Sequence, residues 1–116
     1  MTVSEFARKC GYEILSCVEK ADKTEITGVY VCDLLSMAMA RVKDGQIWIT
    51  VHTNINIVAV AYLSNASCII IPENIEVEEL TIDKANEKGV VIIRAPHTAY
   101  EICINYYLMS TGSGHD

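Results

Sequence analysis

Residues 48–62 read WITVHTNINIVAVAY, and this stretch decides the fold. A run with strand propensity ends in three polar residues, His52, Thr53 and Asn54, and a run rich in alanine and valine follows at once. This order predicts a strand, a short loop and then a helix. A strand that leads directly into a helix is a βα unit, and such units build parallel sheets.

Two more units of the same kind follow. The runs CIII at 68–71 and VVIIR at 90–94 are typical of strands buried on both faces. Helices are predicted after each strand, over residues 54–64, 76–88 and 98–109. Three consecutive units with short loops mean right-handed crossovers and helices packed on the sheet. The predicted fold class is therefore α/β: a small single-domain sandwich with a mixed, mostly parallel sheet and helices on its faces.

The first 23 residues are less regular. Thr2 and Glu5 have the spacing of a capping box, which predicts a short helix that ends at Gly11. Residues 12–18 alternate in polarity and are read as a strand. The polar residues 21–25 form a turn. We expect this half of the chain to add at least one antiparallel neighbour to the sheet.

Residues 26–51 contain two further strands and one helix. Strands are predicted over 26–32 and 46–51, with Gly28 marking a bulge or a close backbone approach. Asp33 is the predicted N-cap of a helix over 34–42. Gly89, later in the chain, has the position of a residue that ends the helix over 76–88.

Length and charge limit the classes of protein. The 116 residues suit one domain, which we place at 1–109, with a flexible C-terminal tail at 110–116. Half of the residues are hydrophobic and 21% are charged, which is a globular composition. The net charge is −6 and no basic stripe occurs, so nucleic acid is not an expected partner.

Cysteine usage and hydropathy favour a cytoplasmic protein. The five cysteines are odd in number, form no CxxC pair and lie mostly in apolar runs, which indicates reduced, buried thiols. The N-terminus has no basic segment followed by an apolar one, and the apolar runs fall short of the ~20 residues that a membrane span needs. No membrane association is expected.

A polar His-Thr pair follows two of the predicted strands, at 52–53 and at 97–98. The carboxyl ends of parallel strands meet at one edge, where open α/β sheets bind ligands at the point at which strand order reverses. Helix N-termini at this edge direct N–H groups towards an anion. The predicted ligand-binding residues are His52, Thr53, Asn54, Glu73, Asn74, His97 and Thr98. The competing interpretation is that these residues are ordinary turn residues and helix caps, as Thr98 with Glu101 and Thr53 or Asn54 would be.

Catalytic and metal sites have little support in the sequence. Neither GxxxxGK(S/T) nor GxGxxG occurs, so no phosphoryl-transfer or dinucleotide motif is present. No third ligand has suitable spacing to the histidines, and the cysteines lie in apolar runs. We therefore expect no enzyme activity, no metal and no cofactor.

The helix over 34–42 is apolar nearly all round, because only Ser36 and Arg41 are clearly polar. Such a helix must be covered on more than one side. The cover is either a second subunit, which predicts a homodimer, or the rest of the same domain. The predicted interface residues are Leu34, Leu35, Met37 and Met39, and the flexible methionines suit such a surface.

The chain resembles the DRTGG domain family, which is related to the amino-terminal domain of HPr kinase/phosphorylase. The resemblance covers roughly residues 10–109. It is carried by Gly28 with VYVCDLLS, by the ITVHTNINIVAVA unit and by the strand–Pro–helix pattern at Pro96. Family members occur between CBS pairs in some pyrophosphatases, in some phosphotransacetylases, and as stand-alone bacterial and archaeal proteins. The sequence departs from the name-giving residues, with His52-Thr53-Asn54 in place of Gly-Asp-Arg and Pro72-Glu73-Asn74 in place of Thr-Gly-Gly.

The resemblance implies a stand-alone regulatory domain that senses a ligand, without catalysis. Its expected ligand is a small anionic metabolite or nucleotide at the strand-end edge, and its expected assembly is a dimer. The alternative is a pure protein–protein interaction module that binds a protein partner and no small molecule. Which strands neighbour one another decides whether His52 and His97 could contact one molecule.

Overall fold

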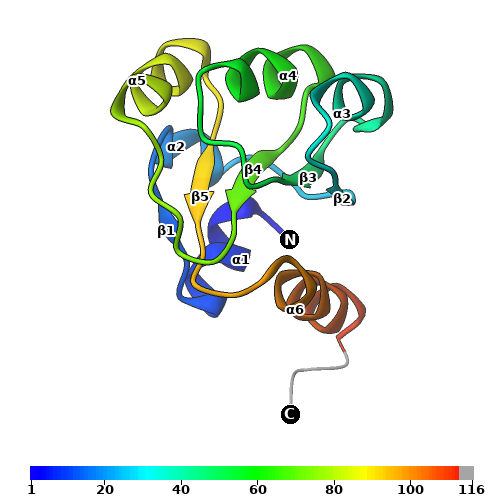
Figure 1. Ribbon diagram of the computed structural model, residues 1–116. Helices are drawn as coiled ribbons and strands as arrows, with labels where there is room; N and C mark the ends of the chain where they lie inside the picture. Colours follow the sequence, from blue (N-terminus) through cyan, green and yellow to red (C-terminus); the bar gives the residue numbers. More distant parts are fainter. Residues whose placement is uncertain (113–116) are drawn as a thin grey trace.

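The computed structural model describes residues 1–112 as a five-stranded sheet between two layers of helices (Figure 1). The strand order is β1-β5-β4-β3-β2. The elements, in chain order, are α1 (Val3–Cys10), β1 (Glu13–Ile14), α2 (Val18–Ala21), β2 (Gly28–Val31), α3 (Leu35–Arg41), β3 (Gln46–Ile49), α4 (Asn56–Ser64), β4 (Cys68–Ile71), α5 (Glu79–Lys88), β5 (Ile92–Arg94) and α6 (Ala99–Thr111).

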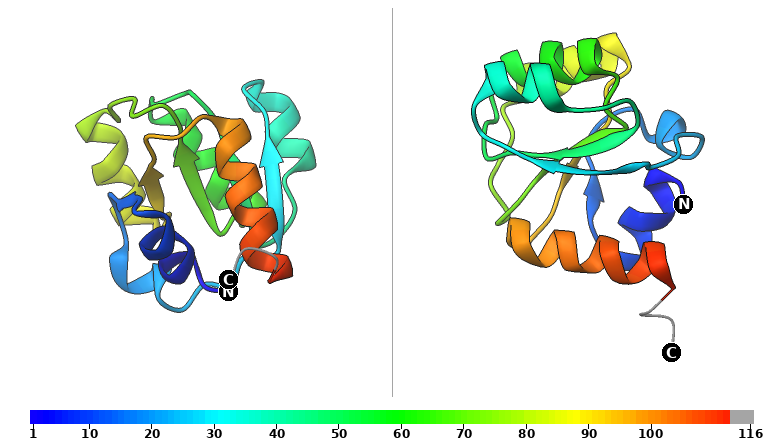
Figure 2. Two further views of the ribbon diagram at one scale, coloured as in Figure 1. Left: turned by 90° about the horizontal axis from the view of Figure 1, so that it is seen from below. Right: turned by 90° about the vertical axis from the view of Figure 1, so that its right-hand side faces the viewer.

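Four strands, β2 to β5, are parallel and lie side by side in chain order, and β1 pairs antiparallel with β5. The structure confirms the predicted α/β class and the antiparallel neighbour. The crossover helices α3, α4 and α5 all cover one face of the sheet. The helices α1 and α6 cover the other face (Figure 2, right). None of the helices in residues 1–112 is long and apolar enough to cross a membrane.

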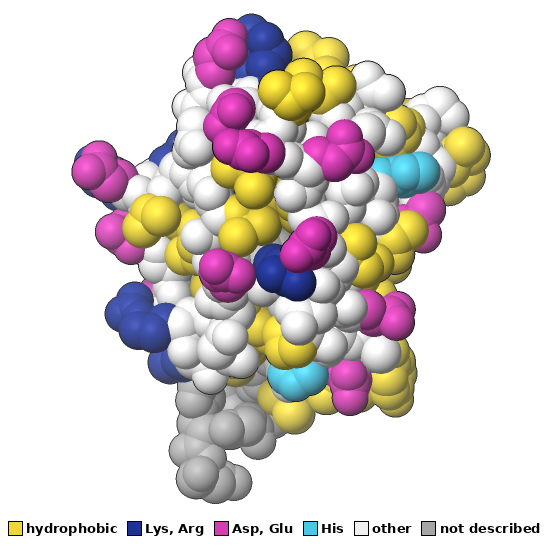
Figure 3. Space-filling view, turned by 60° about the vertical axis from the view of Figure 1, so that its left-hand side comes forward, with side chains coloured by type: hydrophobic (Ala, Val, Ile, Leu, Met, Phe, Trp, Pro, Cys, Tyr) yellow, Lys and Arg dark blue, Asp and Glu magenta, His cyan; other side chains and the backbone are white. Residues whose placement is uncertain are grey.

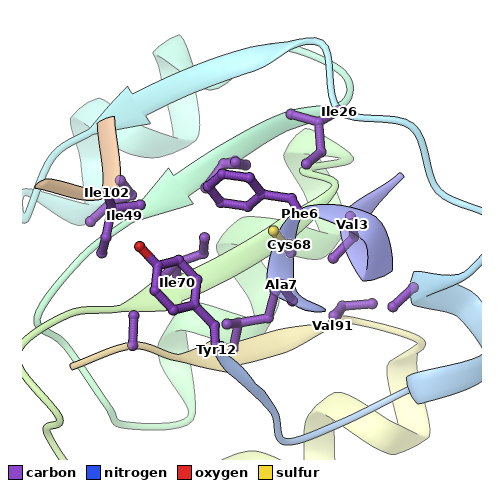
Figure 4. Close-up of a cluster of buried hydrophobic side chains, with 14 residues drawn as sticks. Val3, Phe6, Ala7, Tyr12, Ile26, Ile49, Cys68, Ile70, Val91 and Ile102 are labelled. Carbon is purple, nitrogen blue, oxygen red and sulfur yellow. The ribbon is translucent and has the colours of Figure 1, made fainter. Parts of the chain in front are cut away.

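Alternation along the strands builds a separate core on each face. One core joins Phe6 of α1 and Ile102 of α6 to the strand residues that point towards them, among them Ile49 and Ile70 (Figure 4). The other core joins Trp48, Ile69 and Ile71 to helices α3, α4 and α5. Because both faces are covered, all four residues of β4 are 0% exposed. This double burial is the physical reason for the CIII run.

The predicted helix ends are confirmed at several positions. Thr2 and Thr98 both form capping boxes, each accepting a hydrogen bond from the backbone N–H three residues on. Gly11 and Gly89 end α1 and α5 in the left-handed conformation. Helix α6 continues through Thr111, two residues further than predicted. Residues 113–116 of the predicted tail lie outside the described residues.

Other local predictions were wrong. The strand predicted over 12–18 is only two residues long, and the short helix α2 follows it. Gly28 pairs with Gln46 in a regular parallel ladder, so it marks no bulge. Leu34, not Asp33, holds the N-cap position of α3, because the Asp33 carboxylate is already bound elsewhere.

A buried serine fastens the edge of the sheet. The Ser16 hydroxyl donates to the Val90 carbonyl at 2.7 Å and accepts from the Ile92 N–H at 2.8 Å. Leu15 N–H adds a hydrogen bond to the Ile92 carbonyl. One hydroxyl therefore satisfies a donor and an acceptor that the two-residue strand β1 is too short to reach.

We predict that Ser16→Ala lowers the free energy of unfolding by about 2–3 kcal/mol, because two buried backbone groups lose their partner. The matched control is Ser4→Ala. Ser4 is also buried, but its hydroxyl has no hydrogen-bond partner, so its removal should leave stability unchanged or raise it by up to ~1 kcal/mol. Chemical denaturation of both variants measures the difference. Equal losses in the two would contradict the bridging role of Ser16.

Candidate site at the carboxyl ends of the strands

The loops after β3, β4 and β5 lie at one edge of the sheet, as the sequence predicted. Strand β4 lies between β3 and β5, so the two His-Thr pairs follow strands that are not neighbours. Strand order does not reverse among the parallel strands. The chain nevertheless leaves β4 towards one face and β5 towards the other, because α5 and α6 pack on opposite faces (Figures 1 and 2). The nearest equivalent of a switch point is therefore between β4 and β5.

The loop after β3 is tied to the loop after β2 through Asp33. The Asp33 carboxylate accepts from the Thr50 hydroxyl at 2.8 Å and from the Val51 N–H at 2.9 Å. The His52 ring donates from Nε2 to the Asp33 carbonyl. Asp33 is a residue that the sequence reading placed in a helix cap. Its observed role is to hold two neighbouring loops together.

Thr53 and Asn54 anchor the start of α4 in different ways. The Thr53 carbonyl accepts from the buried hydroxyl of Thr81 at 2.7 Å, and its own hydroxyl lies 3.4 Å from Glu78 Oε2. Asn54 Oδ1 accepts from the Asn56 N–H at 2.9 Å, which is cap chemistry just outside the helix. Thr53 docks the loop onto the start of α5 and is not a cap.

The loop after β4 makes a tight turn through two left-handed residues. Glu73 and Asn74 have φ angles of 60° and 58°. Their N–H groups donate to the His97 and Ala95 carbonyls, both at 2.8 Å. These bonds extend the ladder between β4 and β5 into the loops. Backbone hydrogen bonds therefore join the two loops at the point where the chain divides between the two faces.

Arg94 is the cation at this edge that the site prediction missed. Its Nε and Nη2 donate to the Asn74 carbonyl, at 3.1 and 2.6 Å. It also lines a hollow of about 280 Å³ together with Glu13 and Glu76. The sequence could have indicated Arg94 as a site residue, because it is the last residue of the strand predicted over 90–94. Since the carboxylates of Glu13 and Glu76 line the same hollow, they weaken the attraction of Arg94 for an anion.

His97 packs into the domain. The Tyr12 hydroxyl accepts from Asn105 Nδ2 and is hydrogen-bonded to His97 Nδ1, both at 3.0 Å, and it donates to Nδ1 in the tautomer that carries the ring proton on Nε2. The Tyr12 and His97 rings meet edge to face. Burial raises the pKa of the Tyr12 hydroxyl to about 12, so it stays a donor throughout the physiological range. Sequence gave no signal for Tyr12, because 85 residues separate it from His97.

Thr98 acts as a helix cap. The backbone N–H of Thr98 donates to the Glu101 carboxylate at 2.9 Å, and this bond lowers the pKa of Glu101. The Thr98 hydroxyl accepts from the Glu101 N–H. Of the seven predicted ligand-binding residues, each therefore has an internal hydrogen bond from its side chain or its backbone. Whether any of them also contacts a ligand stays a prediction.

Groups that could support catalysis or metal binding are sparse. Burial raises the pKa of Cys68 to about 12, and it also raises the pKa of the Cys10, Cys17 and Cys103 thiols. Thiols of this kind are poor nucleophiles at neutral pH. Within residues 1–112, no group of three or more His, Cys, Asp or Glu side chains is arranged to hold a metal ion.

The predicted interface on α3 is largely exposed. Leu34 is 59%, Met37 42% and Met39 38% exposed, and Leu35 is half-buried against the core. Ala38 is the buried residue of this helix. The rest of the domain therefore does not cover α3 on every side, which overturns the alternative of a helix sandwiched within the monomer.

Among the side chains drawn in Figure 3, acidic groups are spread between the basic ones and no basic stripe appears.

Comparison with known proteins places this geometry in a family. The family model described as "DRTGG domain" matches residues 5–105. A solved structure, the CBS and DRTGG domains of the regulatory region of Clostridium perfringens pyrophosphatase complexed with the activator diadenosine tetraphosphate, is similar with a TM-score of 0.70 at 16% identity. The similarity covers 87% of this chain and 44% of that one, so the chain spans less than half the length of that structure. At this identity the likeness shows the fold alone. Among curated proteins, none is similar enough to match.

The turn after β4 yields a prediction. A left-handed conformation costs a residue with a side chain about 1–2 kcal/mol, and glycine avoids this cost at the expense of greater freedom in the unfolded chain. Glu73→Gly should therefore raise the free energy of unfolding by about 0.5–1 kcal/mol. The control, Glu76→Gly, removes the same charge from the same loop at a position without positive φ and should lower stability by a similar amount. Thermal and urea denaturation measure both. A loss of stability in Glu73→Gly would contradict the strain.

Proposed function

The chain belongs to the DRTGG domain family, and we propose that it is a regulatory module that senses a small anionic ligand of the nucleotide class. The observation that carries the proposal is the family match over residues 5–105, together with the same fold in a regulatory region complexed with a nucleotide activator. The activator belongs to that protein. It comes to this chain as the first ligand class to test.

We further propose that the module is not an enzyme. The four cysteines with raised pKa values lack the character of activated nucleophiles. The polar groups at the strand-end edge bind one another and leave no paired general acid and base. The five free thiols suit a reducing compartment, so the cytoplasm is the proposed location.

A second candidate function is protein–protein interaction without a small ligand. The observation that favours it is the exposure of three apolar side chains on and beside α3, those of Leu34, Met37 and Met39. Leu34 and Met37 are three residues apart and share one side of the helix, and an exposed apolar side of this kind is typical of an interaction site. Either a second copy of the chain or the protein under regulation would cover this surface.

The first test is a thermal-shift measurement on the purified chain with diadenosine tetraphosphate, ATP, AMP and GTP. A ligand present at 100 times its Kd adds about 2.7 kcal/mol, which raises the Tm of a domain of this size by several degrees. His52→Ala and His97→Asn test the strand-end edge, because asparagine keeps an acceptor for the Tyr12 hydroxyl and spares the fold. We expect at least one nucleotide to raise the Tm of the unaltered protein.

The absence of any shift with the whole panel would contradict the ligand-sensing function. If both histidine variants lose the increase in Tm, the ligand binds at the strand-end edge. Thr111→Ala, far from that edge at the end of α6, is the control variant and should keep the full shift.

The interaction surface on α3 gives a separate prediction. If the chain forms a dimer through this surface, Met37→Lys with Met39→Lys should shift it to monomer, because two charges would become buried at the interface. The paired change should cost the monomer little stability, since both side chains are exposed. Sedimentation velocity at several concentrations gives the mass. If the unaltered chain is still a monomer at the highest concentration, α3 is not a dimer interface.

A further inference from the structure

A hollow of about 460 Å³ lies between helices α4 and α5, on the outer side of the layer that these helices form. One wall consists of α4 residues spaced three and four apart, so they share one side of that helix. The other wall is Lys84 and Lys88 of α5, which are four residues apart and also share one side. The full lining is Ile55, Asn56, Val58, Ala59, Tyr62, Leu63, Lys84 and Lys88.

The apolar side of this hollow is exposed without an evident structural reason. Ile55 is 46%, Tyr62 55% and Leu63 68% exposed. These side chains add little to the core, whose contacts on this face are made by Ile57, Val58 and their neighbours. Binding sites for small molecules combine a mostly apolar lining of this volume with a few polar groups. The hollow has this composition, with Asn56 and the two lysines as its polar groups.

The charge at this hollow is opposite to that of the protein as a whole. The chain has a net charge of −6, yet the charged residues of the lining are both lysines. Lys88 Nζ lies 5.5 Å from the centre of the Tyr62 ring, and Lys84 Nζ lies 3.3 Å from Glu87 in an exposed ion pair. An exposed pair of this kind is weak, so Lys84 can exchange Glu87 for a ligand phosphate at little cost.

Three features therefore converge on one ligand chemistry. Apolar side chains can cover a flat ring, the Tyr62 ring can stack on it, and two ammonium groups one helical turn apart can bind phosphate oxygens. The strand-end edge has fewer groups to offer, because its N–H groups and its arginine are bound to carbonyls of the same domain.

We propose that the hollow between α4 and α5 is the nucleotide site of this module, with the base against Tyr62 and Leu63 and the phosphates at Lys84 and Lys88. The proposal rests on the ligand-sensing function proposed above and names its site. Helix α4 begins at Asn56, two residues after Asn54, so a ligand bound along α4 contacts the element that Thr53 and Asn54 anchor.

The test is a titration of the ¹⁵N-labelled chain with ATP, followed by NMR. Adenosine and tripolyphosphate serve as the two halves of the ligand. The paired change Lys84→Ala with Lys88→Ala should raise the Kd for ATP by about 10-fold or more, because it removes both charge-assisted contacts. The matched control, Lys23→Ala with Lys43→Ala, removes the same two charges outside the hollow and should change the Kd by less than about 2-fold.

The outcomes separate the site from the function. Chemical-shift changes centred on Tyr62, Leu63 and Lys84 support the proposal, provided that adenosine and tripolyphosphate each bind more weakly than ATP. ATP binding that the Lys84 and Lys88 changes leave intact, with shifts centred on His52 or Thr98, overturns this site and keeps the sensing function. Equal loss in the test pair and the control pair shows binding by net charge alone and overturns the site as well. The absence of binding by any nucleotide overturns both.

Discussion

The rest of the structure depends on the burial of β4 on both faces. A strand without exposed residues needs a paired strand on each side and a helix layer on each face, because water reaches none of its groups. Here β3 and β5 supply the pairing. Helices α4 and α5 cover one face as the connections into and out of β4, whereas α1 and α6 are brought to the other face from the two ends of the chain (Figure 2).

This constraint explains which parts of the fold could be predicted. Each of the last three βα units holds its strand signal and its helix signal within about 20 residues, so local pattern sufficed. The segment around β1 lacks such a signal. It pairs through two residues with a strand some 80 positions later, and a serine hydroxyl supplies the remaining contacts. Nothing local distinguishes such a segment from the longer strand that its alternation suggested.

The same distinction applies to the candidate site. Thr98 was recognised as a cap because its partner Glu101 is three residues away. The partners of His97 and His52 are Tyr12 and Asp33, which are distant in sequence, so their hydrogen bonds could not be foreseen. The βα pattern fixed the topology, so the sequence correctly predicted that the seven residues lie at the carboxyl-end edge of the parallel strands. It could not show that most of the donors there are bound within the domain.

The positions of the exposed apolar residues follow from how the sheet is covered. Crossover helices must bury one side against the strands, and α3 and α4 do this through small or β-branched residues such as Ala38, Ile57 and Val58. That requirement does not constrain the residues on the side that faces away from the sheet, where polar residues are expected. Exposed apolar residues nevertheless occur on both helices, Met37 and Met39 on α3 and Tyr62 and Leu63 on α4. Because folding does not require these residues outside, they are the positions on which the proposed ligand site and the proposed interaction surface are built.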